Sequence, residues 1–134
     1  MRVDSIPIPT ADSDEFWEGC RKGFLTMPVC RTCGEINWFP RAMCRNCSGD
    51  DLQWQRMSGE AVVYSCTVVE QRTKEGIESY VLALVDLVEG VRMMTHIMDT
   101  PPEDVKIGMS VTVRFERVSD EISLPVFVPI EALV

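Results

Sequence analysis

Four cysteines in two C-x-x-C pairs constrain this sequence more than any other feature. Cys30 and Cys33 form the first pair, Cys44 and Cys47 form the second, and ten residues separate the pairs. This spacing is typical of two turns that close one tetrahedral metal site with four thiolate ligands. Such a site supplies about 10–16 kcal/mol of apparent binding free energy, enough to fold a segment with almost no apolar core. We therefore expect a structural Zn²⁺ ion; iron in the same thiolate cage and a redox dithiol are the alternatives.

The expected ion is not assigned a part in any reaction. A catalytic zinc keeps an open coordination position for water or substrate, whereas four thiolates fill the tetrahedron. Cys20 and Cys66 have no histidine beside them, and we expect both to be buried as small apolar side chains. His96 is the only histidine, and we expect it to be an outward-facing strand residue. The sequence therefore predicts no catalytic residue.

The composition excludes several classes of protein. The 134 residues are 46% hydrophobic, which allows one substantial core and a small additional module. The net charge of -8 repels nucleic acid and anionic membranes. No apolar run reaches the roughly 18 residues of a membrane span, and the N-terminus lacks the pattern of an export signal. We therefore expect a soluble, cytoplasmic protein whose paired cysteines bind a metal and do not form disulfides.

The N-terminal part is predicted to be an arm followed by a short helix. Residues 1–10 contain two prolines and no repeating apolar face, so we expect an extended arm. A helix over residues 12–22 is indicated by Asp12 as N-cap, Glu15 as its capping-box partner and Gly23 as the stop. Its apolar side is too small for a helix that stands alone, so the helix must dock. That side consists of Phe16, Trp17 and Cys20.

The C-terminal half is predicted to be a five-stranded barrel. A tight turn at Glu89–Gly90 joins the second strand to the third, and a helical turn after Thr100 precedes the fourth. Pro125 and Pro129 are expected to confine the last strand to an edge. Three strands, a helical connection and two more strands are typical of an OB-fold. The five β-rich stretches are residues 61–70, 79–88, 91–98, 110–118 and 124–128.

Two of these strands carry apolar side chains in patterns that bear on packing. In the first strand, alternation predicts that four side chains share one face. The stretch over residues 79–88 is apolar on both faces, and a chain of this size has little left to cover the outer one. We expect a second copy or another protein to cover it. The four side chains of the first strand are Val62, Tyr64, Cys66 and Val68.

The predicted fold is therefore mainly β and has three parts. Residues 1–27 form the arm and the docking helix, residues 28–58 form a four-cysteine zinc ribbon, and residues 59–134 form the OB-fold barrel. Four residues between the cysteine pairs either pack the ribbon onto the helix or form a contact surface for a partner or ligand. Aromatic residues and arginine are typical anchors of such surfaces. The four residues are Trp38, Phe39, Pro40 and Arg41.

A series of short motifs runs along almost the whole chain. They are Phe16-Trp17-Glu18-Gly19, Gly23-x-Leu25, Cys30-x-x-Cys33-Gly34, Pro40-Arg41, Cys44-x-x-Cys47, Trp54, Ser58-Gly59, Val63-x-Ser65-x-Thr67-Val68, Tyr80-Val81-Leu82-Ala83, Glu89-Gly90-Val91-Arg92-Met93 and Ile107-Gly108-Met109. Together these motifs resemble a known family, the thiolase-associated zinc-ribbon/OB-fold proteins. Phe39 and Arg45 depart from the family pattern, in which proline is common at both positions, but the four cysteines are intact.

The resemblance implies a rubredoxin-like zinc ribbon, an OB-fold and the function of a non-catalytic accessory subunit. The implied partner is a thiolase or thiolase-like aldolase that acts on acyl-CoA thioesters, including those of aromatic or steroid degradation. The small subunit completes or stabilises the acyl-CoA site, so a coenzyme A thioester is a candidate ligand. A nucleic-acid-binding ribbon/OB protein and a stand-alone acyl-CoA-binding protein are the alternatives. The candidate partner or ligand surface comprises Trp38, Phe39, Arg41, Phe16 and Trp17.

Overall fold

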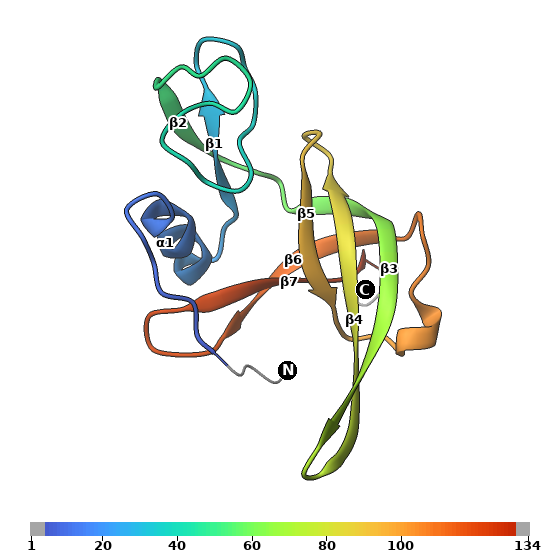
Figure 1. Ribbon diagram of the computed structural model, residues 1–134. Helices are drawn as coiled ribbons and strands as arrows, with labels where there is room; N and C mark the ends of the chain where they lie inside the picture. Colours follow the sequence, from blue (N-terminus) through green and yellow to red (C-terminus); the bar gives the residue numbers. More distant parts are fainter. Residues whose placement is uncertain (1–4, 131–134) are drawn as a thin grey trace. The chain divides into compact units, whose positions relative to one another are not determined.

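The computed structural model describes residues 5–130, in which one α-helix, one short 3-10 helix and seven strands are found (Figure 1). The chain divides into two compact units. One comprises residues 1–58 and 115–125, and the other comprises residues 59–114 and 126–134. Ser5–Thr10 contains no helix or strand. The first four residues of the expected arm lie outside the described part of the chain.

Helix α1 spans Asp14–Lys22 and begins later than the sequence predicted. The prediction of Asp12 as the N-cap is wrong, because Ser13 occupies that position. The Ser13 hydroxyl accepts a hydrogen bond from the Thr10 N–H at 3.0 Å and is buried. A turn that precedes the helix therefore fixes its starting point, and the predicted capping box does not form.

The C-terminal end of α1 has the stop that the sequence predicted. Gly23 is left-handed, with φ of 94°. The N–H groups of Gly23 and Phe24 donate to the carbonyls of Cys20 and Gly19, at 3.2 and 2.9 Å. This pair of bonds satisfies carbonyl groups that a helix end otherwise leaves unpaired. The chain then turns back directly into the first strand.

Strands β1 (Thr26–Cys30) and β2 (Leu52–Arg56) form a two-stranded antiparallel sheet beside α1 (Figure 1). Phe16 and Cys20 on α1 are buried, and Trp17 is half-buried. Burial of a side chain as large as phenylalanine contributes about 1.5–3 kcal/mol. The predicted docking of the small apolar side of the helix is thus confirmed.

Five strands form a closed barrel in the order β3-β4-β5-β7-β6. The 3-10 helix Pro102–Asp104 connects β5 to β6, where the sequence predicted a helical turn. The mainly β fold and the five-stranded barrel are confirmed. The strands are β3 (Glu60–Thr73), β4 (Gly76–Leu87), β5 (Arg92–Ile97), β6 (Ser110–Arg117) and β7 (Ser123–Pro129).

The prediction that the last strand lies at an edge is wrong. β7 lies between β5 and β6 and closes the barrel. Its parallel pairing with β5 joins Ile97 and Phe127, and the Met98 N–H donates to the Phe127 carbonyl at 2.8 Å. Pro125 and Pro129 lack an N–H group, but the contact with β5 uses a carbonyl that lies between them. The prolines therefore restrict the ladder without placing the strand at an edge.

The side chains of the first barrel strand, β3, do not all face the side that the sequence predicted. Val62 and Tyr64 are exposed, whereas Val63 between them is buried in the core. A β-bulge directly after Val63 interrupts the alternation. Beyond it, Cys66 pairs with the buried Ala83, and directly paired residues lie on the same face. The four side chains predicted to share one face therefore divide between two.

Strand β4 is apolar on both faces, as the sequence predicted. Alternate residues from Val81 to Leu87 are buried in the barrel. Tyr80, Leu82 and Leu84 belong to the outer face and are half-buried. No segment among the described residues buries this outer face completely.

Strands β3 and β4 continue beyond the barrel as a two-stranded hairpin (Figure 1). The hairpin pairing runs from Val69 with Tyr80 to Thr73 with Gly76, whereas the pairing of β4 with β5 begins only at Val81. The sequence predicted strands up to residue 70 and from residue 79, because the polar residues between them lack alternation. Hydrogen bonds that continue from the barrel ladder extend both strands past the apolar pattern.

We expect Gly59→Ala to destabilise the protein by about 2–4 kcal/mol. Gly59 precedes β3 with φ of 85°, and a Cβ there would lie 2.4 Å from Cγ1 of Val113. Urea unfolding followed by circular dichroism measures the loss. Gly76→Ala is the matched control, because Gly76 has φ of 122° but a Cβ there would have no neighbour within 4 Å. Equal losses in the two variants would contradict the packing argument.

Candidate metal centre

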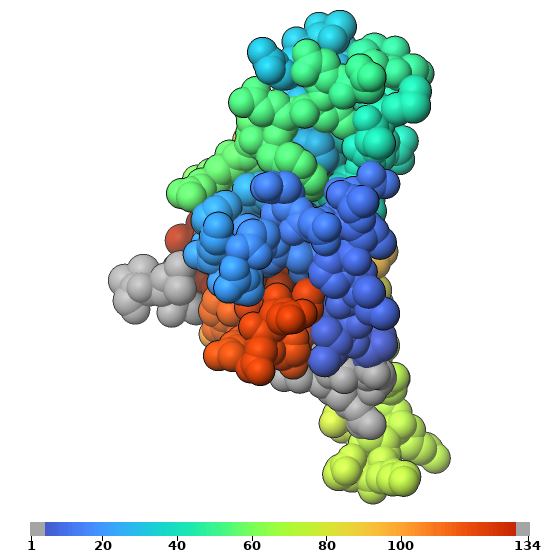
Figure 2. Space-filling model, turned by 90° about the vertical axis from the view of Figure 1, so that its left-hand side faces the viewer, coloured from blue at the N-terminus to red at the C-terminus, as the bar shows by residue number. Residues whose placement is uncertain are grey.

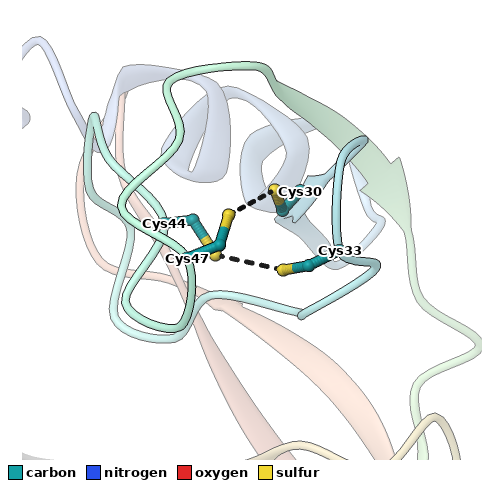
Figure 3. A group of neighbouring side chains, drawn as sticks. All are labelled: Cys30, Cys33, Cys44 and Cys47. Atoms are coloured by element: carbon teal, nitrogen blue, oxygen red, sulfur yellow. Dashed lines mark hydrogen bonds between the residues drawn. The ribbon is translucent and has the colours of Figure 1, made fainter.

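The four cysteines of the two pairs converge on one point, and each directs its sulfur toward the other three (Figure 3). All four sulfurs lie within 4.8 Å of one another. The Cys30–Cys47 and Cys33–Cys44 sulfur pairs are each 3.6 Å apart. A tetrahedral site with metal–sulfur bonds of about 2.3 Å has sulfurs about 3.8 Å apart. The donor set and its spacing therefore fit a tetrahedral metal ion, and no fifth ligand is needed.

The first cysteine pair sits in a tight turn at the end of β1, called here the first knuckle (Cys30–Glu35). The Gly34 N–H donates to the Cys30 carbonyl at 2.8 Å, and the Cys30 N–H donates to the Glu35 carbonyl at 2.9 Å. Gly34 has φ of 80°, which favours glycine. These bonds turn the chain back on itself, so that both thiols point to one side.

The second knuckle (Cys44–Gly49) repeats the same hydrogen bonds at the same spacing. The Ser48 N–H donates to the Cys44 carbonyl at 2.9 Å, and the Cys44 N–H donates to the Gly49 carbonyl at 2.7 Å. Ser48 is left-handed with φ of 63° and holds the position that glycine holds in the first knuckle. The two C-x-x-C pairs are thus two copies of one turn that face each other across the metal position.

The four thiols differ in burial, and the pKa values of Cys44 and Cys47 are shifted in opposite directions. Cys30 and Cys44 are buried, whereas Cys33 and Cys47 are exposed. Backbone N–H groups of Cys47 and then Asn46 lower the pKa of Cys44 to about 6. Cys47 accepts from the Gly49 N–H, which lowers its pKa, but hydrogen bonds with neighbouring thiols outweigh this and raise the pKa to about 11. A metal ion that binds all four cysteines as thiolates must displace the protons that they still carry.

The aromatic residues between the knuckles divide between two roles. Trp38 packs on Phe16 of α1, with ring centroids 4.9 Å apart. Phe39 is 54% exposed, and Arg41 and Met43 are also exposed. Trp38 thus fits the packing alternative, whereas Phe39 and Arg41 fit the surface alternative. Met43 was not singled out in the sequence, because exposure of an isolated methionine has no sequence signature.

Trp17 lines a hollow of about 600 Å³ beside α1. The turn between β6 and β7 forms the other wall, and Figure 2 shows this turn (orange-red) against the N-terminal segment (blue). Among the described lining residues, carboxylates dominate, Arg21 is the one basic residue, and there is no cysteine or histidine. The remaining lining residues are Pro9, Asp14, Glu15, Glu18, Asp120 and Glu121.

The other candidate residues offer no catalytic arrangement among residues 5–130. Cys20 is buried, as predicted, and Cys66 is half-buried in an apolar pocket of about 170 Å³ on the barrel. His96 lies against the ring of Tyr80, with centroids 4.8 Å apart, and burial lowers its pKa. A nucleophile paired with a base is not found in either hollow. The described helices also include none with the length and apolar character of a membrane span.

Comparison with known proteins decides the family. Residues 17–53 match the rubredoxin-like zinc ribbon domain of ChsH2, and residues 54–116 match the C-terminal OB-fold domain of ChsH2. A DUF35 domain-containing scaffold protein of Methanocaldococcus jannaschii is 32% identical over 109 residues, which are 78% of this chain and 77% of that protein. The chain belongs to the ChsH2/DUF35 family. The resemblance seen in the motifs is thereby confirmed.

Two further relatives of this ChsH2/DUF35-family chain are a chain of a solved aldolase structure and a longer protein. The solved structure named Ltp2-ChsH2(DUF35) aldolase contains a chain that matches with a TM-score of 0.83 and 30% identity, over 92% of this chain and 98% of that one. A probable enoyl-CoA hydratase alpha subunit of Thermomonospora curvata is 32% identical over 126 residues. The match covers 92% of this chain but only 40% of that subunit.

We expect the purified chain to bind one equivalent of metal and Cys44→Ser to lose both the metal and the ribbon fold. A serine hydroxyl is not a thiolate, and the remaining three ligands leave the buried side of the site open. Elemental analysis measures the metal, and circular dichroism measures the fold. Cys66→Ser is the matched control, because Cys66 lies outside the cluster. A full equivalent of metal in Cys44→Ser would refute the four-thiolate site.

Burial raises the pKa of the Cys20 thiol to about 12. In the unfolded chain this thiol ionises near its ordinary pKa of about 8.5, so the unfolded state loses the proton first. The contribution of Cys20 to stability is complete below about pH 8.5 and is lost as the pH rises toward 12, by at most about 1.4 kcal/mol per pH unit. The natural chain should therefore have a larger free energy of unfolding than the Cys20→Ala variant, and the difference between the two should be smaller at pH 10 than at pH 8. A constant difference would contradict the buried thiol.

Proposed function

We propose that this chain is a non-catalytic accessory subunit of a thiolase-superfamily enzyme that acts on acyl-CoA thioesters. The match to a chain of the Ltp2-ChsH2(DUF35) aldolase structure carries the proposal. That name joins a second component, Ltp2, to the DUF35 component, and the match covers 98% of the matched chain. The whole module, rather than one shared motif, is therefore similar. The enoyl-CoA hydratase subunit supports the same class of thioester substrate.

The chemistry of the described residues is consistent with a partner that performs the reaction. The chain has one histidine, and the ring of Tyr80 covers one side of it. Cys44, whose pKa is lowered to about 6, belongs to the four-cysteine cluster, where it would be held as a metal ligand. A reaction on a thioester requires a nucleophile and a base within reach of one substrate atom. In this proposal the larger enzyme supplies both.

We infer that the metal of the four-cysteine site is zinc and that its role is structural. Cys30, Cys33, Cys44 and Cys47 would hold it, and zinc bound in this way holds the two knuckles together. Thiolates stay available for metal in a reducing compartment, so we also assign the chain to the cytoplasm. No ligand position is left for a substrate, which keeps the acyl-CoA chemistry away from the ion.

The loop between the two knuckles, residues 36–43, is called here the ribbon loop. It is the proposed contact surface for the enzyme. Phe39 is 54% exposed and Met43 is 56% exposed, although both are large apolar side chains. Arg41 is exposed between them in the sequence. Aromatic residues, methionine and arginine are enriched where protein interfaces are buried, because they combine large contact area with directed hydrogen bonds. The same loop is the candidate surface for part of the coenzyme A thioester.

Co-expression with thiolase-superfamily proteins from the same genome tests the proposal. We expect one of them to form a stable heteromer with this chain in size-exclusion chromatography. Phe39→Ala should weaken the complex about tenfold, as loss of an anchor residue typically costs more than 1 kcal/mol. Ile107→Ala is the matched control, because Ile107 is also apolar and is 72% exposed in the connection between β5 and β6.

A chain that remains alone with every candidate enzyme would refute the accessory-subunit proposal. Calorimetry of the isolated chain with an acyl-CoA thioester then distinguishes the alternatives. Micromolar binding without any enzyme would favour a stand-alone acyl-CoA-binding protein. If Phe39→Ala and Ile107→Ala weaken the complex equally, the ribbon loop is not the contact surface, but the accessory-subunit proposal still holds.

A further inference from the structure

Asn37 is a fully buried polar residue between the two knuckles, with 0% of its surface exposed. Its side-chain Nδ2 donates to the Glu35 carbonyl at 3.2 Å and to the Cys44 sulfur at 3.7 Å. Its Oδ1 accepts from the Arg45 N–H at 2.8 Å. Its backbone N–H donates to the Pro28 carbonyl at 2.8 Å. One residue thus links β1, the first knuckle and the second knuckle.

The orientation of the Asn37 amide is determined by these partners. The Arg45 N–H is a donor, so it requires the amide oxygen and not the nitrogen. The two hydrogens of Nδ2 then face the Glu35 carbonyl and the Cys44 sulfur, which are both acceptors. A flipped amide would set donor against donor and oxygen against sulfur. All the polar groups of this buried amide are therefore used in one arrangement.

Cys44 depends on such donors more than an exposed ligand does. A metal-bound thiolate keeps negative charge on its sulfur, and only 3% of the Cys44 surface is exposed to water. Protein N–H groups must therefore replace the solvent. The Asn46 N–H donates to this sulfur at 3.4 Å, and the Asn37 amide donates at 3.7 Å. Asn37 is the side chain that supplies one of these bonds, so a substitution can remove it.

We propose that Asn37 is a positioning residue of the metal centre, which retains the ion by holding the Cys44 sulfur and the second knuckle in ligand geometry. The exposed ligands Cys33 and Cys47 are open to a competing chelator, whereas Cys30 and Cys44 are not. Release of the ion must therefore wait until a buried ligand leaves. Asn37 restrains one of these two, and residues in this relation to a ligand typically change metal affinity 10–100-fold. The inference rests on the zinc proposed above.

The rate of zinc transfer from the loaded, full-length chain to a colorimetric chelator tests the proposal. Asn37→Ala removes all the side-chain bonds, and Asn37→Asp keeps an acceptor for the Arg45 N–H but replaces the donor to Cys44 with a carboxylate oxygen. We expect both to release zinc 10–100-fold faster than the natural chain. A variant that cannot be loaded at all, while the control loads, is the extreme of the same result.

Thr26→Val is the matched control, because Thr26 is buried in β1, the strand that Asn37 contacts through Pro28, and its hydroxyl has no hydrogen-bond partner among the described residues. It should release zinc at the natural rate even if its overall stability changes. Release from both Asn37 variants within twofold of the natural chain would overturn the proposal. Equal acceleration in Thr26→Val would also overturn it, since general loosening would then be the cause.

Cobalt substitution gives a second readout, which a merely structural role would not change. Loss of the N–H to sulfur bond raises the energy of the thiolate electrons, so the sulfur-to-cobalt charge-transfer band of Asn37→Ala should move to longer wavelength. The band of Thr26→Val should not move. If the band of Asn37→Ala is unchanged, Asn37 does not donate a hydrogen bond to the metal-bound Cys44 sulfur, and the proposal is overturned. Metal content of the natural chain is measured first, so absence of zinc is distinguished from failure of the Asn37 proposal.

Discussion

Four thiolates that meet at one point determine the ribbon. The segment between β1 and β2 is mostly turns, and only a few of its side chains are buried, among them Asn37 and Pro40. Zinc binding to four thiolates typically supplies about 10–16 kcal/mol, which equals or exceeds the net stability of an ordinary domain. With the proposed zinc bound, the two knuckles gain their fixed conformation from the ion.

The barrel depends on a different interaction, the burial of apolar side chains that alternate along its strands. Val63, Val85, Val111 and Phe127 are each 1% exposed or less and come from four different strands. Burial of each contributes about 1.5–3 kcal/mol without any ligand. The barrel therefore needs no ligand, whereas the ribbon segment between β1 and β2 depends on its four-cysteine site. This division explains how a ribbon with almost no apolar core can occur in a chain with 46% hydrophobic residues.

The sequence predicted the features that depend on local spacing and on apolar alternation, including the five-stranded barrel, but not the details that depend on how distant segments pack. The C-x-x-C spacing predicted the cluster, and Gly23 predicted the helix end, because each depends on a few neighbouring residues. Pro125 suggested an edge strand, but closure of the barrel placed β7 between β5 and β6. The bulge after Val63 likewise has no sequence signal, and it changed which side chains face the core. Asn37 was missed because its role depends on a contact with the other knuckle.

Hydrogen bonds of Asn37 connect the metal centre to the proposed partner surface. Asn37 and Arg45 lie at the two ends of the ribbon loop that carries Phe39 and Met43, and the Arg45 N–H donates to Asn37 Oδ1 at 2.8 Å. Cys44 directly precedes Arg45 in the sequence and therefore lies beside this hydrogen bond. A loop whose ends are held together loses less conformational entropy when a partner binds than a free loop does. In the proposed complex, a structural ion would therefore influence recognition without contacting the substrate, because it would fix the base of the loop proposed to contact the enzyme.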